Sequence, residues 1–189
     1  MSTTSPPRSV ALLDSAVAYT RAALEPARRS PLDLATPCAG WALGHLLLHM
    51  EDSLEAITEA AEAGRVVVED NPRRLDADRI VNRVVQRACH LHGAWSARMT
   101  SAPVAVGGLT LGRDTVVLVG ALEIAVHGWD VAETTGWPSP LPEELAVDLL
   151  EVAQAVVTPA DRGRRFGPAR AVPPTASAGT RLLAHLGRG

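Results

Sequence analysis

The polar side chains with the clearest chemical potential stand in the segment EIAVHGWD, residues 123–130, of an otherwise apolar stretch. On a helix, steps of four and three residues bring Glu123, His127 and Asp130 to one face. A carboxylate buried in such an apolar seam is costly unless it is paired or binds a metal. The stripe therefore requires partners, and the Glu-x-x-x-His pair presents two ligands, one turn apart, to a single cation.

A second pair of possible ligands, His45 and His49, stands one helical turn apart in an earlier apolar segment. If the two segments form neighbouring helices, three or four nitrogen and oxygen ligands can meet in the core of a bundle. Such a set suits Zn²⁺ first, with Ni²⁺, Fe²⁺ or Mn²⁺ as alternatives. Gly120, one turn before Glu123, is expected to leave room for a molecule bound to the cation.

Each of these side chains also has a purely structural interpretation. Either pair alone is more often a hydrogen-bonded polar pair than a metal site, and the two together are the stronger indication. His92 lies on the inward stripe of its helix, where it either lines the same pocket or bonds a backbone carbonyl. Cys38 is either a buried inert thiol or a thiol activated at a helix start. The side chains of Trp41, Trp95 and Trp129 are expected first in the core, and only secondarily as walls of a pocket.

Helical periodicity dominates the chain and predicts the elements that must position these residues. Four long amphipathic helices indicate an all-α fold, a four-helix bundle, with a small hairpin or loop in VAVGGLTL before the fourth helix. Thr36 is the expected N-cap of the second helix, with Pro37 in its first turn. The first expected helix ends near residue 25, and the second begins between residues 36 and 41 and ends near 64. The third runs from about 76 to 99, the fourth from 114 to 135, and a shorter fifth covers 145–156. A last short turn of helix is expected in TRLLAHLG.

Length and composition fit one soluble domain over residues 1–189, with residues 1–8 disordered. The tail, residues 159–189, is rich in Pro and Arg and carries six Arg against one acid, so it can dock on the acidic remainder. Two cysteines and no secretion signal favour the cytoplasm. No uncharged apolar run reaches the ~20 residues that span a membrane, and a pI of about 6.1 argues against nucleic-acid binding.

Three stretches carry a resemblance to a known family. TPCAGWALGHLLLHM (36–50), EIAVHGWDVAETTG (123–136) and RFGPARAVPPTASAGTRLLAHLGR (165–188) resemble the mycothiol-dependent maleylpyruvate isomerase family of the DinB-like superfamily, in particular its short metal-binding members. The resemblance implies a DinB-like four-helix bundle that holds a divalent metal, usually zinc. It also implies His49, Glu123 and His127 as the ligands, and it places His45 outside them.

The resemblance further implies a reaction. A metal-bound thiolate of mycothiol adds to a conjugated cis double bond, permits rotation and leaves, so the enzyme would be an isomerase or a thiol transferase acting on a small electrophile. Asp130 would orient the ring of His127, or would instead pair with an arginine of the tail. The full isomerase carries a further C-terminal domain that this chain is expected to lack, which puts maleylpyruvate itself in question.

Two other functions stay open at this point. One is a metal enzyme that uses no thiol and acts as a Lewis acid in a hydrolysis, lyase or cyclisation reaction. The other is a non-enzymatic metal-binding protein in which His45 completes a closed set of ligands. The expected partners are small molecules, without nucleic acid or membrane, and a homodimer is compatible with the sequence.

Overall fold

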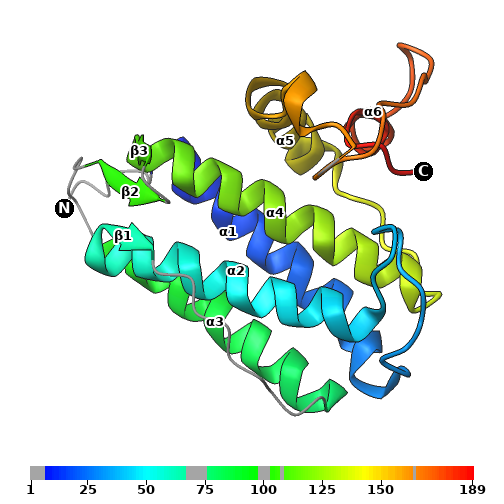
Figure 1. The fold of residues 1–189 in the computed structure, drawn as a ribbon, viewed down its shortest axis with the longest axis horizontal. Coiled ribbons are helices and arrows are strands. Elements are labelled where there is room, and N and C mark those ends of the chain that lie inside the picture. Colours follow the sequence, from blue (N-terminus) through cyan, green and yellow to red (C-terminus); the bar gives the residue numbers. More distant parts are fainter. Residues whose placement is uncertain (1–6, 67–75, 98–102, 107–108, 164) are drawn as a thin grey trace.

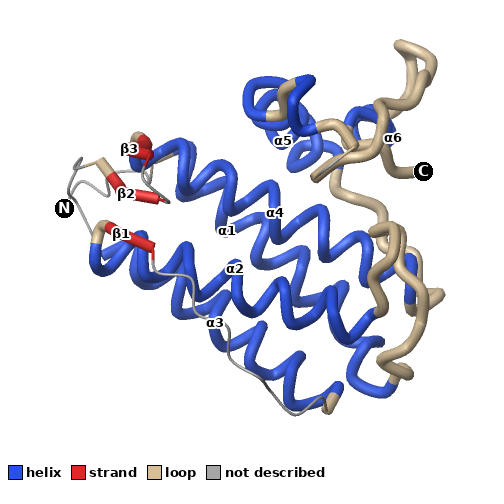
Figure 2. Tube along the Cα trace, viewed as in Figure 1, coloured by secondary structure: helices blue, strands red, loops and turns tan. Residues whose placement is uncertain are grey.

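The computed structural model describes residues 7–66, 76–97, 103–106, 109–163 and 165–189, and these are mostly helical (Figure 2). The predicted all-α class is confirmed. The helices are α1 (Arg8–Leu24), α2 (Leu43–Ala63), α3 (Ala77–Ala97), α4 (Arg113–Thr134), α5 (Glu143–Val156) and α6 (Ala178–His185), with short 3-10 turns at Glu25–Arg29 and Pro159–Asp161. The strands are β1 (Arg65–Val66), β2 (Val104–Val106) and β3 (Leu109–Leu111).

The four long helices α1 to α4 lie side by side and form the bundle (Figure 1). Helix α4 packs against α1 and α2, and α3 packs against the same two helices from the other side. The expected contact between the second and fourth helices is therefore present. Helices α5 and α6 pack on each other, and α5 also contacts α4.

The bundle forms because each helix has an apolar stripe. On α1, the spaced residues Val10, Leu13 and Val17 are all buried, as the periodicity of the sequence predicts. Helix α4 is long and apolar enough by composition to cross a membrane, but 72% of its most apolar window is buried against the rest of the protein. Such burial is typical of the core helix of a bundle.

The start of α2 differs from the prediction. Thr36 does not cap the helix, because its hydroxyl hydrogen-bonds the backbone carbonyl of Trp41 at 2.9 Å, and Ala35 pairs with Ala42 across a turn. The segment 35–42 therefore folds back on itself, and α2 begins only at Leu43. The consequence is that this turn, rather than a helix, places Cys38 and Trp41 beside the first turns of α2.

Two other helix starts also differ slightly. Helix α1 begins at Arg8, so the disorder expected through residue 8 extends too far, and residues 1–6 lie outside the described part. Helix α4 begins at Arg113, so Asp114 sits in the first turn instead of at the cap. There Asp114 accepts a hydrogen bond from the hydroxyl of Ser9 at 2.8 Å, which ties α4 to α1.

The predicted hairpin is confirmed, since β2 and β3 pair in antiparallel fashion around residues 107–108, which are not described. A third strand, β1, pairs in parallel with β2 and was not predicted. Two residues are too few to show a period, so the sequence gives no sign of this strand.

Two glycines of α4 allow other helices to approach it closely. A Cβ on Gly120 would lie 2.9 Å from Cδ1 of Ile57 in α2, so this space is filled by a side chain, and the expectation of room for a bound molecule is wrong. A Cβ on Gly128 would lie 2.9 Å from Oγ1 and 3.2 Å from Cα of Thr20 in α1. The Thr20 hydroxyl also donates to the carbonyl of Ile124 at 2.9 Å, which fixes this contact.

The contact at Gly128 predicts a measurable loss of stability. Gly128→Ala should destabilise the protein by about 1–3 kcal/mol, because the added methyl group meets the backbone of α1 and cannot be relieved by a side-chain rotation. Gly93→Ala is the matched control, since a Cβ there meets nothing within 4 Å. It should be neutral or stabilise by about 0.5–1 kcal/mol through helix propensity. Urea unfolding of both variants checks this, and equal effects would contradict the packing argument.

Candidate metal centre

Three possible metal ligands converge from α2 and α4. Nε2 of His49 lies 2.6 Å from Oε1 of Glu123, and Nε2 of His127 lies 3.3 Å from the same oxygen. One ligand atom from each residue lies within 4.8 Å of the others. Two imidazole nitrogens and a carboxylate oxygen form a donor set that suits a borderline divalent cation such as Zn²⁺. The residues present therefore fit the metal that the sequence predicts.

The three side chains differ in their exposure to solvent. The side chain of His127 is 10% exposed, that of Glu123 28% and that of His49 36%. The cluster thus has a closed inner side at His127 and an open outer side at His49, where a small molecule can reach it.

Two further residues border the open side. The indole of Trp41 stands edge-on to the ring of His49, with centroids 4.9 Å apart, and is 37% exposed. Trp41 therefore lies outside the core, contrary to the first expectation, and its place beside His49 fits the alternative of a pocket wall, whereas Trp95 is buried as expected. The hydroxyl of Ser53, one turn after His49, lies 3.5 Å from both His49 Nε2 and Glu123 Oε1.

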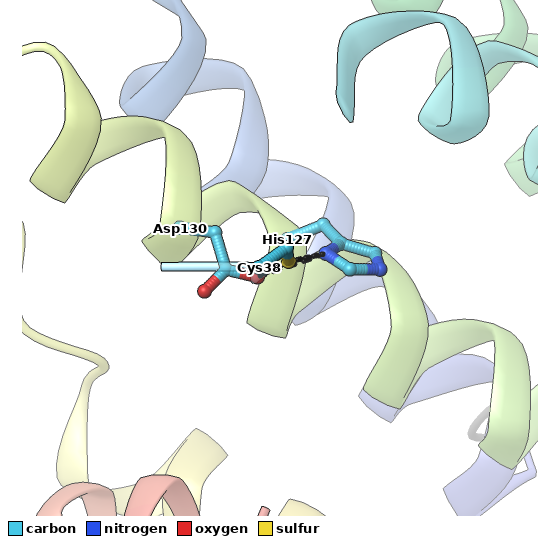
Figure 3. A group of neighbouring side chains, drawn as sticks. All are labelled: Cys38, His127 and Asp130. Atoms are coloured by element: carbon cyan, nitrogen blue, oxygen red, sulfur yellow. Dashed lines mark hydrogen bonds and ion pairs between the residues drawn. The ribbon is translucent and has the colours of Figure 1, made fainter. Parts of the chain in front are cut away.

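A second cluster lies on the inner side of His127 and comprises Cys38, His127 and Asp130 (Figure 3). Nδ1 of His127 lies 2.9 Å from Oδ2 of Asp130 and 3.8 Å from Sγ of Cys38. The thiol of Cys38 donates to the same Asp130 oxygen at 3.2 Å. The ring of His127 therefore joins the two clusters, with one nitrogen in each.

The inner cluster already has a cation, the guanidinium of Arg188. Its Nε donates to Oδ1 of Asp130 at 2.7 Å and its Nη2 donates to Oδ2 at 2.8 Å. Nη2 also lies 3.4 Å from Sγ of Cys38. Because the carboxylate is neutralised in this way, the outer cluster of His49, Glu123 and His127 is the better place for a metal.

Both contacts that the sequence suggests as alternatives for Asp130 are present together. Its carboxylate contacts the imidazole of His127 and pairs with an arginine of the tail. When Nδ1 of His127 carries the proton that bonds Asp130, the lone pair of Nε2 faces Glu123 and His49. A hydrogen-bonded carboxylate behind a histidine is the usual device that fixes the tautomer and the orientation of a metal ligand.

The charges of the cluster shift the pKa values of its members. Burial alone would raise the pKa of Glu123, but the charge of His127 and the hydrogen bonds with His127 and His49 outweigh it and hold this pKa well below its usual range. Burial alone would lower the pKa of His127, but the charge of Glu123 and the hydrogen bonds with Asp130 and Cys38 raise it well above the usual value. Without metal, the centre thus stores a proton on His127 between two carboxylates.

The pKa values of the ion pair on the inner side, Asp130 and Arg188, are also shifted in favour of the charged forms. Burial would raise the pKa of Asp130, but the hydrogen bonds from His127 and Arg188 lower it. Burial would lower the pKa of Arg188, but the hydrogen bond and the charge of Asp130 raise it. Asp130 therefore stays a carboxylate although its side chain is fully buried.

The other residues considered from the sequence lie elsewhere or are not described. His45 is exposed on α2 and belongs to neither cluster of possible ligands in the described part of the chain. The side chain of His92 lies outside the described residues. Metal binding by His49, Glu123 and His127 stays a prediction, which the geometry makes possible.

Three residues of the site were missed or undervalued. Ser53 follows His49 by four residues, so helical spacing was enough to place it on the same face. Cys38 was considered mainly as an inert buried thiol, and its place depends on the turn before α2 that the sequence did not predict. Arg188 is one of six tail arginines, and nothing in its local sequence separates it from the other five.

Comparisons with known proteins bear on this site. The family model described as mycothiol maleylpyruvate isomerase N-terminal domain matches residues 13–132. Two proteins of Mycobacterium tuberculosis, named as uncharacterized protein MT0763 (strain CDC 1551 / Oshkosh) and uncharacterized protein Rv0738 (strain ATCC 25618 / H37Rv), are each 27% identical over 157 residues. These matches cover 81% of this chain and 82% of each relative. No solved structure matches the chain.

The stored proton predicts a pH-dependent contribution to stability in the metal-free protein. The raised pKa of His127 stabilises the fold below the usual histidine value of 6.5, and this stabilisation is lost as the pH rises through the raised pKa. The lowered pKa of Glu123 stabilises the fold above the usual glutamate value of 4.5, and this stabilisation is lost as the pH falls through the lowered pKa. Both contributions are fully present together only between pH 4.5 and 6.5, and each declines gradually outside this range.

His127→Gln should therefore lower the free energy of unfolding most at about pH 5.5, and this cost should shrink as the pH rises through the raised pKa of His127. Urea unfolding in the presence of a chelator measures this difference. His45→Gln is the control for the loss of an imidazole from α2, because His45 is exposed and belongs to neither described cluster of possible ligands. A cost of His127→Gln that does not change with pH would contradict the electrostatic account.

Proposed function

This chain belongs to the mycothiol maleylpyruvate isomerase N-terminal domain family, and we propose that it is a metal-dependent enzyme that uses a small thiol, mycothiol, to isomerise or modify an electrophile. The observation that carries the proposal is the convergence of His49, Glu123 and His127 from two packed helices, with ligand atoms within 4.8 Å. The proposed ion is Zn²⁺, and the proposed location is the cytoplasm, where free cysteines such as Cys38 and Cys89 stay reduced.

The protein's own residues prepare the centre for this chemistry. Because α2 and α4 are rigid and in contact, His49, Glu123 and His127 need little reorganisation to point at one cation. Three protein ligands leave coordination positions for other molecules, as catalytic sites require. A divalent cation held there supplies one property, which is to lower the pKa of a coordinated thiol so that it is a nucleophile near neutral pH.

The ligand charges favour an anionic sulfur. Two neutral imidazoles and one carboxylate leave a divalent centre with net positive charge, which attracts a thiolate more strongly than a neutral alcohol or amine. The half-exposed indole of Trp41 next to His49 offers an apolar surface for the carbon skeleton of thiol or electrophile. We propose that the substrate approaches from this open side, because the inner side of His127 is filled by Asp130, Cys38 and Arg188.

Metal analysis tests the centre directly. The purified chain should carry about one divalent ion per molecule. His49→Ala and His127→Ala should each weaken zinc binding by more than about a hundredfold. Loss of a group that only hydrogen-bonds a ligand costs about 10- to 100-fold in metal affinity, and loss of the ligand itself should cost more. His45→Ala, which changes the same residue type one turn from His49, should bind zinc like the unaltered chain. Unchanged metal content in both ligand variants would refute the site.

Thiol dependence tests the reaction. The zinc-loaded protein should convert an electrophile with a conjugated cis double bond only when mycothiol is added, and Glu123→Gln should lower the rate by at least about a hundredfold. Product isomers are followed by ultraviolet absorption. Turnover that ignores the thiol would indicate the Lewis acid alternative. Zinc binding with four protein ligands and no turnover would indicate a structural metal instead.

A further inference from the structure

We propose that Arg188, the next-to-last residue of the chain, is a positioning residue for the metal centre. It holds the carboxylate of Asp130 in the one orientation in which that carboxylate fixes the ring of His127. The inference rests on the proposed function only in that the centre binds a metal, and it does not depend on which thiol or electrophile is used. Neither the family match, which ends at residue 132, nor the predicted ligand set includes this residue.

The contact between Arg188 and Asp130 is bidentate and buried. Nε and Nη2 of Arg188 reach the two different oxygens of the carboxylate at 2.7 and 2.8 Å. The side chains are 10% and 0% exposed, respectively. Two parallel hydrogen bonds from a planar guanidinium fix the plane of a carboxylate, which a single point charge does not. The oxygen Oδ2 is thereby held 2.9 Å from Nδ1 of His127.

The end of α6 is built to aim Arg188 at this place. The N–H of Arg188 donates to the carbonyl of Leu183 at 2.8 Å, and the N–H of Gly187 donates to that of Ala184 at 3.1 Å. This pair of bonds is a Schellman motif, which needs a left-handed residue after the helix end. Gly187 supplies it with φ of +80°.

A second contact fixes the same turn. A Cβ on Gly187 would lie 2.8 Å from the backbone of Gly167, so the two glycine segments touch directly. The guanidinium of Arg162 donates to the carbonyls of Gly167 and His185 at 3.1 and 2.6 Å, which ties this loop to the end of α6. The backbone around Arg188 is therefore fixed before its side chain meets Asp130.

Removal of the guanidinium would leave the carboxylate of Asp130 with His127 and the thiol of Cys38 as its side-chain partners in the described part of the chain. A buried carboxylate that loses its charged partner is strongly unfavourable, so it turns toward water or draws water in. Either movement breaks the hydrogen bond to Nδ1 of His127, and the ring loses its fixed orientation. The exposed arginines of the same tail, Arg170 and Arg181, lie on the surface and do not replace it.

The test compares zinc affinity among three variants. Arg188→Met removes the guanidinium but keeps an apolar chain, and it should weaken zinc binding by about 10- to 100-fold. Arg188→Lys keeps the charge without the two-point contact, and it should recover only part of this loss. Arg181→Met changes an exposed arginine of α6, the helix that precedes Arg188, and as the matched control it should bind zinc like the unaltered chain. Affinities come from competition with a chromophoric chelator on the full-length protein.

The cobalt-substituted protein supplies a readout that a purely structural role would not change. The visible bands of Co²⁺ should shift in Arg188→Met and in Asp130→Asn. The double variant should lose less zinc-binding free energy than the sum of the losses in the two single variants. Chelator-treated samples of each variant are checked for folding by circular dichroism. If Arg188→Met does not fold, the intermediate affinity of Arg188→Lys carries the test alone.

Two results would overturn the proposal, and they differ in what else they remove. Zinc affinity and cobalt bands of Arg188→Met and Arg188→Lys within twofold of the unaltered chain would refute the role of Arg188 and leave the metal centre standing. An unaltered chain that binds no zinc would refute both this inference and the proposed function. Absence of thiol-dependent turnover with intact zinc binding would refute only the proposed reaction.

Discussion

The carboxylate of Asp130 is wholly removed from water near the C-terminal end of α4, and much of the structure around the site follows from that constraint. A buried charge needs both an opposite charge and hydrogen-bond donors. Here these come from three separate segments, which are the turn before α2 with Cys38, α4 itself with His127, and the tail with Arg188. Segments distant in the sequence are thus held together by one carboxylate.

The imidazole of His127 connects the buried ion pair of Asp130 and Arg188 with the open cluster, because its ring contacts both. One ring nitrogen faces Asp130 and the other faces Glu123, so the ring cannot rotate without breaking contacts on both sides. The two clusters of possible ligands share this ring but differ in charge balance, since only the inner one includes a guanidinium. In the outer cluster, the described partners of Glu123 are the two imidazoles and a serine hydroxyl, so a bound cation there would be matched by its carboxylate.

Sequence periodicity predicted the helices and the stripe on α4 because apolar spacing directly reflects which face is buried. It failed where a backbone turn competes with a helix, as at Thr36, whose hydroxyl serves the 35–42 turn instead of capping α2. It also failed at Gly120, since a missing side chain looks the same in sequence whether a ligand or Ile57 fills the space. The choice of His49 over His45 came from the family resemblance, because both satisfy the same spacing.

The pairing of Asp130 with Arg188 was beyond sequence reasoning for a different reason. It depends on how α5 and α6 return to α4 and on the turn at Gly187, and neither is encoded by a local period. The candidate metal ligands lie on the helices α2 and α4, whereas their surroundings come from the tail and the turn at 35–42. Such a division separates the parts that set ligand geometry from the segments that tune it, so changes in loops and tails can alter the chemistry while the ligand set stays fixed.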